Sequence, residues 1–422
     1  MARGRGNFGL SKFLGHAVYN DWKLAIQLFQ RVESFTAANL RVPSESLIQL
    51  LELANKIGSQ HIVKMLLTLE PLDHNDLLRR ALKHNLVEVV EILLENWANV
   101  NSLNKNEYMP IHLAIQFGSP DIVALLVQNG ARVDPPMVQG QHLMNYALSY
   151  KNAEVIEILL KADANLNSRN DYDAYPIHMA VSLGLLDCVK LLKTYGADIN
   201  ARAAKGWRPI HYAVHAGFTE MVRYLLQNGA EVNPKNDHGS MPIHLAAQQG
   251  YSDIIELLIE YGGDIYANGN ARWLPLHYAA YFKHFKAAQF LISNGGYYDS
   301  ETDEGCTPTD LAMMFGNVSI LKLFLNNGAI VREDFIQMAI VEHQVDMIKP
   351  LIEHGLDVNL KIGPFGNAAF HEAVKCGCVQ CFNALTECIK LGANTNMKDN
   401  DGKTLLEYAL SKGKLNIFKY LS

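Results

Sequence analysis

Apolar and polar residues follow one another along this 422-residue chain in a pattern that repeats every 33 residues. Each period holds a short apolar segment around an alanine, a turn, a longer apolar segment and a polar loop. The alanines of the regular part are Ala81, Ala114, Ala147, Ala180, Ala213, Ala246, Ala279 and Ala312. A fixed period of this length indicates a repeat array, in which stacked units bury apolar faces that none could bury alone.

The longer apolar segment of each period predicts a helix of about three turns. An acidic residue stands in its first turn, where the helix dipole favours negative charge; these residues are Asp121, Glu154, Asp187, Glu220 and Asp253. Most of these segments end at a glycine, which can take the left-handed conformation that closes a helix; the glycines are Gly130, Gly196, Gly229, Gly262, Gly295 and Gly328. Each period therefore predicts a short helix, a tight turn, a longer helix and an extended loop.

A recurring motif opens the short segments. It stands as Pro110-Ile111-His112-Leu113 and returns in the same form from Pro176, Pro209, Pro242 and Pro275. Together with Gly-Ala-Asp-Ile-Asn at residues 196–200, this motif resembles the ankyrin-repeat family. Further alanines extend the resemblance to about thirteen repeats and nearly the whole chain: Ala17, Ala54, Ala339, Ala373 and Ala409. The resemblance implies an all-α repeat solenoid, a helix-turn-helix stack with short β-hairpin loops.

Two spacings between alanines are only 27 residues, from Ala54 to Ala81 and from Ala312 to Ala339. The resemblance implies that most of a hairpin is missing at both joints, and we expect them to be weak points or bends. Asp334 is expected to cap the helix that follows the second joint. We therefore divide the chain into a disordered basic lead-in at 1–10, divergent repeats at 11–80, regular repeats at 81–328, and divergent repeats with a cap at 329–422.

The motif histidines lack the neighbour that the family usually provides, a threonine before the proline whose hydroxyl bonds the imidazole. Only Thr307 keeps that position, so we expect the histidines at 112, 178, 211, 244, 277 and 371 to bond backbone groups of neighbouring repeats. A row of metal ligands or bases is the alternative. It is disfavoured because each histidine stands in a different repeat, about 10 Å from the next at ordinary helix packing distances.

Composition and charge argue against several function classes. With 37 basic and 43 acidic side chains the net charge is −6, which gives no electrostatic reason to expect nucleic-acid binding. No run of 18 apolar residues exists, so we expect no membrane insertion. No apolar run follows Arg3 and Arg5, which argues against a Sec-type signal peptide. We expect a cytoplasmic monomer, with a nuclear location and non-Sec secretion left open.

Four of the six cysteines fall close together, at Cys376, Cys378, Cys381 and Cys388. Four thiolates could bind zinc at such a spacing. The repeat register instead gives Cys381 the apolar position that valine holds at 123, 189 and 222, and coordination by all four would disrupt the helix pair. We therefore expect structural thiols and no metal or other cofactor, with reversible thiol chemistry as a minority alternative.

No catalytic motif stands in the chain. It contains no Gly-x-Ser-x-Gly, no Walker loop, no His-Glu-x-x-His and no dinucleotide-binding fingerprint. The turn residues at 363–367 occupy a hairpin position, which explains them without catalysis. We expect a protein without enzyme activity.

In the family, hairpin tips and the ends of the first helices line one concave groove, and large aromatic residues recur at those positions here. Trp207 and Trp273 are expected to be solvated unless a partner covers them, and Trp and Tyr dominate binding hot spots. The alternative is that such rings pack between repeats, which suits Phe117 and Phe315. The predicted partner-binding residues are Tyr108, Tyr150, Tyr172, Arg202, Lys205, Trp207, Arg208, His215, Lys235, His238, Arg272, Trp273, Tyr281 and Phe282.

The charges near these rings indicate the kind of partner. The central hairpins carry basic residues, and the flanking hairpins are acidic at Asp171, Asp173, Glu301, Asp303 and Glu304. Such a groove suits a protein segment of mixed charge. The resemblance thus implies a non-enzymatic scaffold or adaptor. The alternatives are a secreted effector or inhibitor that occludes a host protein or enzyme, and a substrate-recruiting subunit of a ubiquitin ligase, for which we expect no room for a docking box after Ser422.

Overall fold

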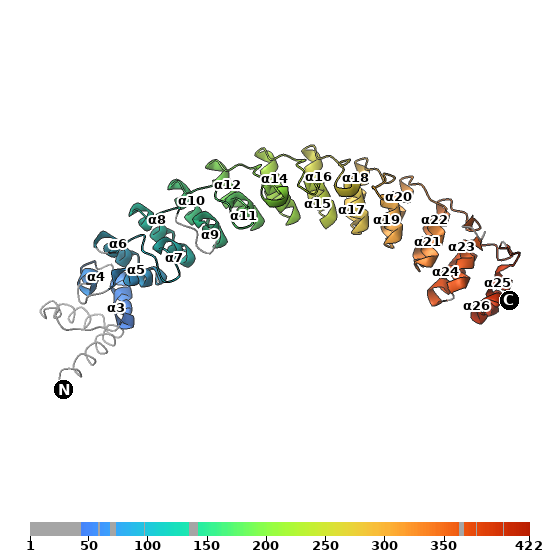
Figure 1. The fold of residues 1–422 in the computed structure, drawn as a ribbon, viewed down its shortest axis with the longest axis horizontal. Coiled ribbons are helices and arrows are strands. Elements are labelled where there is room, and N and C mark those ends of the chain that lie inside the picture. Colours follow the sequence, from blue (N-terminus) through green and yellow to red (C-terminus); the bar gives the residue numbers. More distant parts are fainter. Residues whose placement is uncertain are drawn as a thin grey trace, which may run out of the picture. The chain divides into compact units, whose positions relative to one another are not determined.

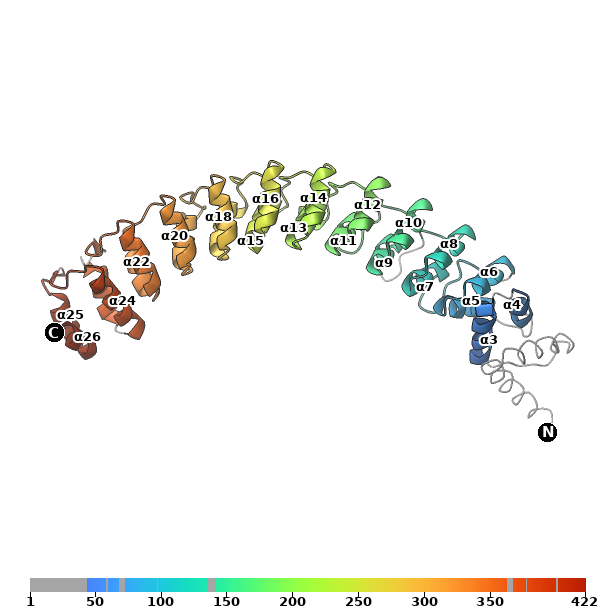
Figure 2. The same cartoon turned by 180° about the vertical axis from the view of Figure 1, so that it is seen from behind.

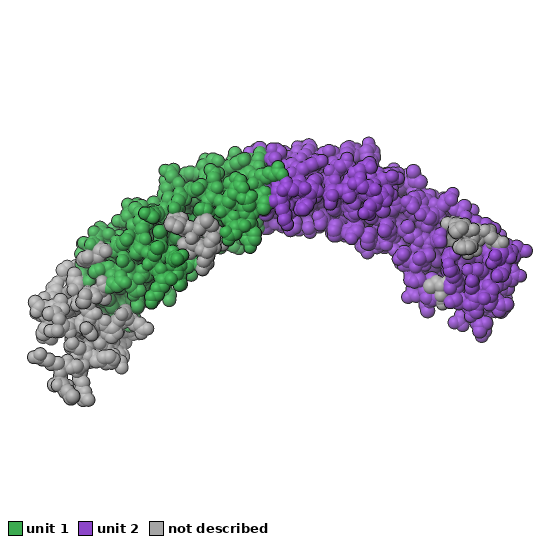
Figure 3. All heavy atoms as spheres, in the orientation of Figure 1, with its two compact units in different colours: residues 1–204 green, residues 205–422 purple. Residues whose placement is uncertain are grey.

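The computed structural model describes residues 44–57, 60–67, 73–96, 98–134, 142–362, 367–376, 378–399 and 401–422. The chain divides into two compact units, Met1–Ala204 and Lys205–Ser422, which are described separately (Figure 3). The predicted lead-in at 1–10 and the first predicted repeat, around Ala17, lie outside the described residues. None of the described helices is both long and apolar enough to cross a bilayer.

Unit 1 is a stack of helix pairs, in which first helices pack on first helices and second helices on second helices (Figure 1). The pairs are α3 (Ser44–Ile57) with α4 (Gln60–Leu67), α5 (His74–Lys83) with α6 (Val87–Asn96), α7 (Pro110–Phe117) with α8 (Pro120–Gln128), α9 (Leu143–Ser149) with α10 (Ala153–Lys161), and α11 (Pro176–Ser182) with α12 (Leu186–Thr194).

Unit 2 is built in the same way, from stacked helix pairs (Figure 2). They are α13 (Pro209–His215) with α14 (Thr219–Gln227), α15 (Pro242–Gln249) with α16 (Ser252–Glu260), α17 (Pro275–Tyr281) with α18 (Phe285–Ser293), α19 (Pro308–Met314) with α20 (Val318–Asn326), α21 (Phe335–Val341) with α22 (Val345–Glu353), α23 (Ala369–Cys376) with α24 (Val379–Lys390), and α25 (Leu405–Ser411) with α26 (Leu415–Leu421). The predicted all-α repeat solenoid is confirmed.

The predicted register is confirmed by the alanines. Every anchor alanine from Ala54 to Ala409 is buried, so each first helix approaches its neighbours closely at that point. The second helices bury an apolar face in the same register. In α14 the buried residues are Met221, Val222, Leu225 and Leu226, and α16 repeats the pattern with isoleucine and leucine. This shared seam is the core, because each pair covers the apolar face of the next.

The turn between the two helices of a pair has a left-handed residue, and glycine usually fills that position. Gly217 and Gly250 have φ values of 74° and 78° there. A Cβ at either would lie within 3.0 Å of the following repeat, against Tyr251 and His284 respectively. At four other turns a residue other than glycine takes the same conformation: Asn85, Lys151, Lys283 and His343, with φ between 55° and 64°. A side chain at this turn therefore points at the next repeat.

Asparagine side chains join the loops of consecutive repeats. In unit 2 the Asn233 amide donates to the carbonyl of Gly262 at 2.9 Å and accepts from the amide of Asp264 at 3.0 Å. Asn101 in unit 1 and Asn359 in unit 2 make the same pair of bonds with the repeat that follows. Backbone groups of consecutive loops are thus joined through a side chain and without strand pairing.

The predicted hairpins are present mostly as closed turns. At residues 236–240 the amide of Asn236 donates to the carbonyl of Ser240 at 3.0 Å, and the Asn236 side chain accepts from two backbone amides of the same turn. Among the described residues, strands pair only as β1 (Lys361–Ile362) and β2 (Asn367–Ala368), in one antiparallel ladder. Residues 363–366 between them lie outside the description.

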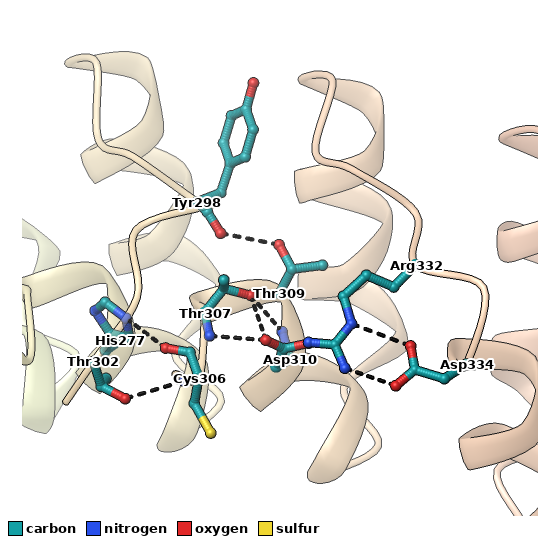
Figure 4. A network of polar contacts seen from close by, with 9 residues as sticks. All are labelled: His277, Tyr298, Thr302, Cys306, Thr307, Thr309, Asp310, Arg332 and Asp334. Atoms are coloured by element: carbon teal, nitrogen blue, oxygen red, sulfur yellow. Dashed lines mark hydrogen bonds and ion pairs between the residues drawn. The ribbon is translucent and has the colours of Figure 1, made fainter. Parts of the chain in front are cut away.

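The second short joint runs directly from α20 to α21, as predicted. Ion pairs between side chains stabilise it (Figure 4). Arg332 lies 3.0 Å from the buried carboxylate of Asp310 and 2.6 Å from that of Asp334. The Asp310 contact is an ion pair without good hydrogen-bond geometry, whereas its other oxygen accepts from the amide and hydroxyl of Thr307, both at 2.9 Å. Arg332 thus ties the joint to the start of α19.

The predicted capping role of Asp334 is wrong. Asp334 stands at the N-cap of α21, but its side chain accepts no amide of that helix because it faces Arg332 instead. The neighbouring guanidinium lowers the pKa of this carboxyl. At the first short joint the cap is Asp73, whose side chain accepts from the amides of Asn75 and Asp76.

Candidate partner-binding site

The histidines of the recurring motif stand in the first turn of the first helices, and those at 178, 211, 244 and 277 bond backbone groups through both ring nitrogens. In His211 and His244, Nδ1 accepts the amide of the N-cap residue at 3.0 Å. The other nitrogen meets a carbonyl 23 residues downstream, Pro234 at 3.1 Å and Ala267 at 2.8 Å respectively. The expected backbone partners are thus confirmed for the histidines at 178, 211, 244 and 277. The acceptor equivalent for His112, residue 135, lies outside the description, whereas in His371 Nδ1 accepts the amide of Ala368 and Nε2 meets no partner among the described residues.

Burial keeps these imidazoles neutral. It lowers the pKa of His112 and of His277 to about 4, and that of His244 and His371 in the same direction. A ring that bonds backbone at both nitrogens has no lone pair to offer a metal or a substrate. The histidines at 178, 211, 244 and 277 are therefore structural, and the candidate site is sought among the aromatic residues beside them.

A large aromatic group surrounds Trp273 in unit 2. Trp273 follows two left-handed residues, Ala271 and Arg272, at the end of its hairpin turn. The ring is half-buried against α17, with centroids 5.0 Å from Tyr278 and 5.5 Å from Tyr281. Both tyrosines lie on one face of α17, because positions three apart in a helix are neighbours. The local fold therefore lays the indole across its own helix.

This group reaches into the next repeat. Tyr281 packs edge to face on Phe282, with centroids 4.9 Å apart, and on Phe315 at the end of α19, with centroids 4.5 Å apart. Tyr281 and Phe282 keep 37% and 41% of their surface exposed. We call Trp273, Tyr278, Tyr281, Phe282 and Phe315 the Trp273 cluster. It is an apolar surface built from two consecutive repeats.

A smaller copy of this arrangement stands two repeats earlier in unit 2. The ring of Trp207 lies 5.1 Å from Tyr212 and 5.5 Å from His215, centroid to centroid. Both partners are on α13 at the positions that Tyr278 and Tyr281 hold on α17. We call these three residues the Trp207 cluster. Both tryptophans were expected at solvated tips, whereas each is half-buried because its own helix offers a ring to pack against.

Unit 1 holds a separate group of tyrosines. Tyr108 packs on His112 and Tyr146, and Tyr146 packs on Tyr150 with hydroxyls 3.2 Å apart. Burial and that hydrogen bond raise the pKa of Tyr146. Of the two predicted residues here, Tyr108 is half-buried and Tyr150 is exposed at the end of α9.

The remaining predicted residues are scattered rather than joined to these groups. Tyr172 is 80% exposed at the tip of its turn in unit 1. Arg202, Lys205, Lys235 and His238 are exposed as well. These positions are accessible, and none of them belongs to the aromatic groups described above.

Two of the predicted basic residues are already paired within unit 2. Arg208 lies 2.5 Å from Glu231, and Arg272 lies 3.9 Å from Asp303. The acidic Asp173 in unit 1 is likewise paired, with Arg169. The central hairpins are therefore less basic than expected, because Arg208 and Arg272 each lie beside a carboxylate.

The sequence interpretation missed the residues on which the tryptophans rest. Tyr212 and Tyr278 follow the motif histidine directly, five residues after each tryptophan. Among the repeats with the Pro-x-His motif, only these two carry tyrosine at this position, and the same two carry the tryptophan. That coincidence was the available signal.

Two shallow hollows of the described surface lie away from the clusters. One is lined by the loop Gly295–Ser300 together with Asn327, and the other by α5, Lys105 and Phe117. Neither gathers groups with the geometry of acid, base and nucleophile. The aromatic clusters stay the best candidate for function.

Comparison with known families agrees with this architecture. The family model described as ankyrin repeats (3 copies) matches residues 77–170, 177–269, 267–334 and 335–422. These segments cover most of the chain and include both aromatic clusters of unit 2.

Proposed function

The chain belongs to the ankyrin-repeat family, and we propose that it is a non-enzymatic scaffold or adaptor that binds a protein partner through the aromatic surface of unit 2. Ankyrin repeats generally serve as protein-interaction modules, which supports the general role. The specific proposal concerns where the partner lies. A cytoplasmic location, a monomeric state and the absence of nucleic-acid binding stay predictions from the sequence.

The Trp273 cluster is the observation that carries the proposal. Its rings hold one another in place across α17 and α19, yet Tyr281 and Phe282 expose about two fifths of their surface. A partner that covers such rings removes apolar area from water, and the rings lose little rotamer freedom because packing already fixes them. Aromatic anchors of this kind dominate binding energy at protein interfaces.

The Trp207 cluster supports an extended partner. It repeats the indole-on-tyrosine arrangement two repeats away, on the order of 20 Å if neighbouring first helices pack about 10 Å apart. An extended chain covers about 3.3 Å per residue, so roughly six residues would reach from one cluster to the other. The partner we propose is therefore a protein segment in extended conformation, with apolar side chains at two separated positions.

The charges beside the clusters favour a partner segment of mixed charge. Arg208 with Glu231 and Arg272 with Asp303 place both signs beside the tryptophans. Alternating charge at the edge of an apolar surface is typical of a polar rim, which favours selectivity more than affinity. A polyanion would meet repelling carboxylates at the same places.

The test compares partners captured from the cells that make the protein. Full-length wild type, Trp273→Ala, the Trp207→Ala/Trp273→Ala double variant and the control Tyr172→Ala are used as baits, and captured segments are then synthesised and titrated. Tyr172 is a suitable control because it is an exposed aromatic outside the clusters. Each tryptophan change should weaken binding by about 2 kcal/mol or more, roughly thirtyfold, and Tyr172→Ala should not.

Circular dichroism and hydrogen exchange must show that the variants keep their helices, because both indoles pack on their own repeats. A folded double variant that binds the captured segment as tightly as wild type would refute the proposed surface. The partner would then have to contact the second helices or unit 1.

A further inference from the structure

Three side chains with metal-binding atoms meet in unit 2, away from the aromatic clusters. The Nδ1 atom of His343 lies 3.3 Å from the sulfur of Cys381 and 3.7 Å from the sulfur of Cys378. Their ligand atoms all lie within 4.8 Å of one another. His343 comes from the turn between α21 and α22, and the cysteines come from the start of α24 in the next repeat.

The distances match those of a tetrahedral zinc site. Zinc binds cysteine sulfur at about 2.3 Å and histidine nitrogen at about 2.0–2.1 Å. At a tetrahedral angle these bonds separate sulfur from nitrogen by roughly 3.6 Å, between the two values found here. The same imidazole nitrogen faces both sulfurs, so the three ligand atoms converge on one possible position for an ion.

The repeat geometry explains why these residues meet. His343 occupies the left-handed turn position, with φ 60°, from which a side chain points at the following repeat. Cys378 is the N-cap of α24, and its sulfur accepts the amide of Cys381 at 3.3 Å. At the same N-cap position, His284 and Gln344 reach back to carbonyls of the preceding repeat. Here that contact is made between a thiol and an imidazole.

The structure also separates these cysteines from the fourth. Cys388 is fully buried two turns further along α24, and burial raises the pKa of its thiol to about 12. It is a core residue, as expected from the sequence. Cys381 is buried too, but it stands three residues after the N-cap, the position of Ile122, Cys188 and Met221, one place earlier than the register predicted. The side chain of Cys376 lies outside the described residues.

We propose that His343, Cys378 and Cys381 bind one Zn²⁺ ion, which clamps the α21–α22 turn to the start of α24. Two thiols and one imidazole form a soft donor set that suits zinc. On binding, the two thiols release their protons to solvent, the imidazole binds as the neutral ring, and solvent takes the fourth position. His343 is exposed and Cys378 half-buried, which leaves the ion a path of entry.

The test uses the full chain, reduced and freed of metal by a chelator. Zn²⁺ is titrated against a chromophoric competitor, and Co²⁺ replaces it to report geometry by its absorption. Wild type should bind one Zn²⁺ per chain and give the intense visible bands of tetrahedral Co²⁺ with thiolate ligands. Zinc should also raise the melting temperature, because it binds the folded state.

The matched variants are His343→Asn and Cys378→Ser, with Cys306→Ser as control. Asparagine tolerates the left-handed turn, as Asn85 does in another repeat, so His343→Asn should fold. Cys306 is a half-buried thiol elsewhere in unit 2. Both ligand variants should bind Zn²⁺ at least about 100-fold more weakly and lose the thermal shift, while Cys306→Ser behaves as wild type.

Equal zinc affinity in wild type and His343→Asn would overturn the proposal, because the imidazole would then not be a ligand. An octahedral Co²⁺ spectrum in the wild type would overturn it as well. So would a disulfide between Cys378 and Cys381 that persists in protein purified with zinc present.

Discussion

The ion pair at the second short joint gives a prediction that can be worked out from the structure. At 3.0 Å, two unit charges attract by roughly 5–6 kcal/mol at an effective dielectric constant of about 20, before desolvation and screening. The Asp310 side chain is 5% exposed and that of Arg332 is 47% exposed. Losing one partner of a fully buried pair costs about 3–5 kcal/mol, and losing an exposed pair costs about 0–1 kcal/mol. We expect Arg332→Ala to lower the local stability by about 2 kcal/mol.

The assay must be local, because a stack of repeats need not unfold in one step. Hydrogen exchange measured on peptides from α19 to α21 reports the free energy of opening the joint. Peptides from α15 and α16 in the same protein serve as an internal reference. Their protection should be the same in Arg332→Ala and wild type.

A double-mutant cycle isolates the pair from the other contacts of Arg332, which also meets Asp334 and the ring of Phe335. Asp310→Asn removes the charge while its side-chain oxygen can still accept from the amide and hydroxyl of Thr307. In that background Arg332→Ala should cost clearly less than in wild type. An equal cost in both backgrounds, or a loss below about 0.5 kcal/mol in wild type, would refute the account of the joint.

Two further predictions concern stability. Burial lowers the pKa of His112 and His277 from 6.5 to about 4, so between these pH values the unfolded chain binds more protons than the folded one. The free energy of unfolding should therefore be highest above pH 6.5 and fall as the pH drops toward 4. A urea midpoint that stays constant from pH 7 to pH 4.5 would contradict this. Leu225→Ala or Leu258→Ala should cost about 2–5 kcal/mol of unfolding free energy by leaving a core cavity, whereas Leu410→Ala at an exposed position should cost under about 0.5 kcal/mol in the same denaturation experiment.

The register of the fold was predictable because it depends only on the repeat period along the sequence. A fixed period determines which residues of each repeat are equivalent, so one buried alanine places all the others. The partners of the histidines followed for the same reason. Once the usual hydroxyl at the position before the proline is absent, a buried ring must find backbone groups, and the neighbouring loop is the nearest source.

The details of the site depend on contacts across repeats and were harder to predict. Trp273 was assigned to a solvated tip because a turn position says nothing of where a large ring will lie. Its direction is set by Tyr278 on the helix that follows. The Zn²⁺ site proposed above was missed because the cysteines were considered within one repeat. Their third partner, His343, stands 35 residues before Cys378 and meets it only through the left-handed turn.

At Asp334, too, contacts outside the helix that it precedes decide the role of the side chain. An aspartate before a helix is a good cap by local rules. It fails here because Arg332, two residues earlier, offers a stronger partner and is itself held by Asp310 of the preceding repeat. The ion pair with Arg332 therefore replaces the helix cap that the local sequence around Asp334 predicts.

The histidine contacts have a direction, and it limits how far the repeats are interchangeable. The imidazoles at 178, 211, 244 and 277 donate to a carbonyl 23 residues downstream, so each of these repeats needs a full-length loop after it. The repeat of α19, which precedes the short joint, carries Asp310 instead, and that carboxylate finds its partners in Thr307 and Arg332. A repeat grafted upstream of the wrong loop would bury a donor or a charge with nothing to meet it. The residue at the third position of a first helix, histidine or Asp310, thus limits which loop can follow that repeat.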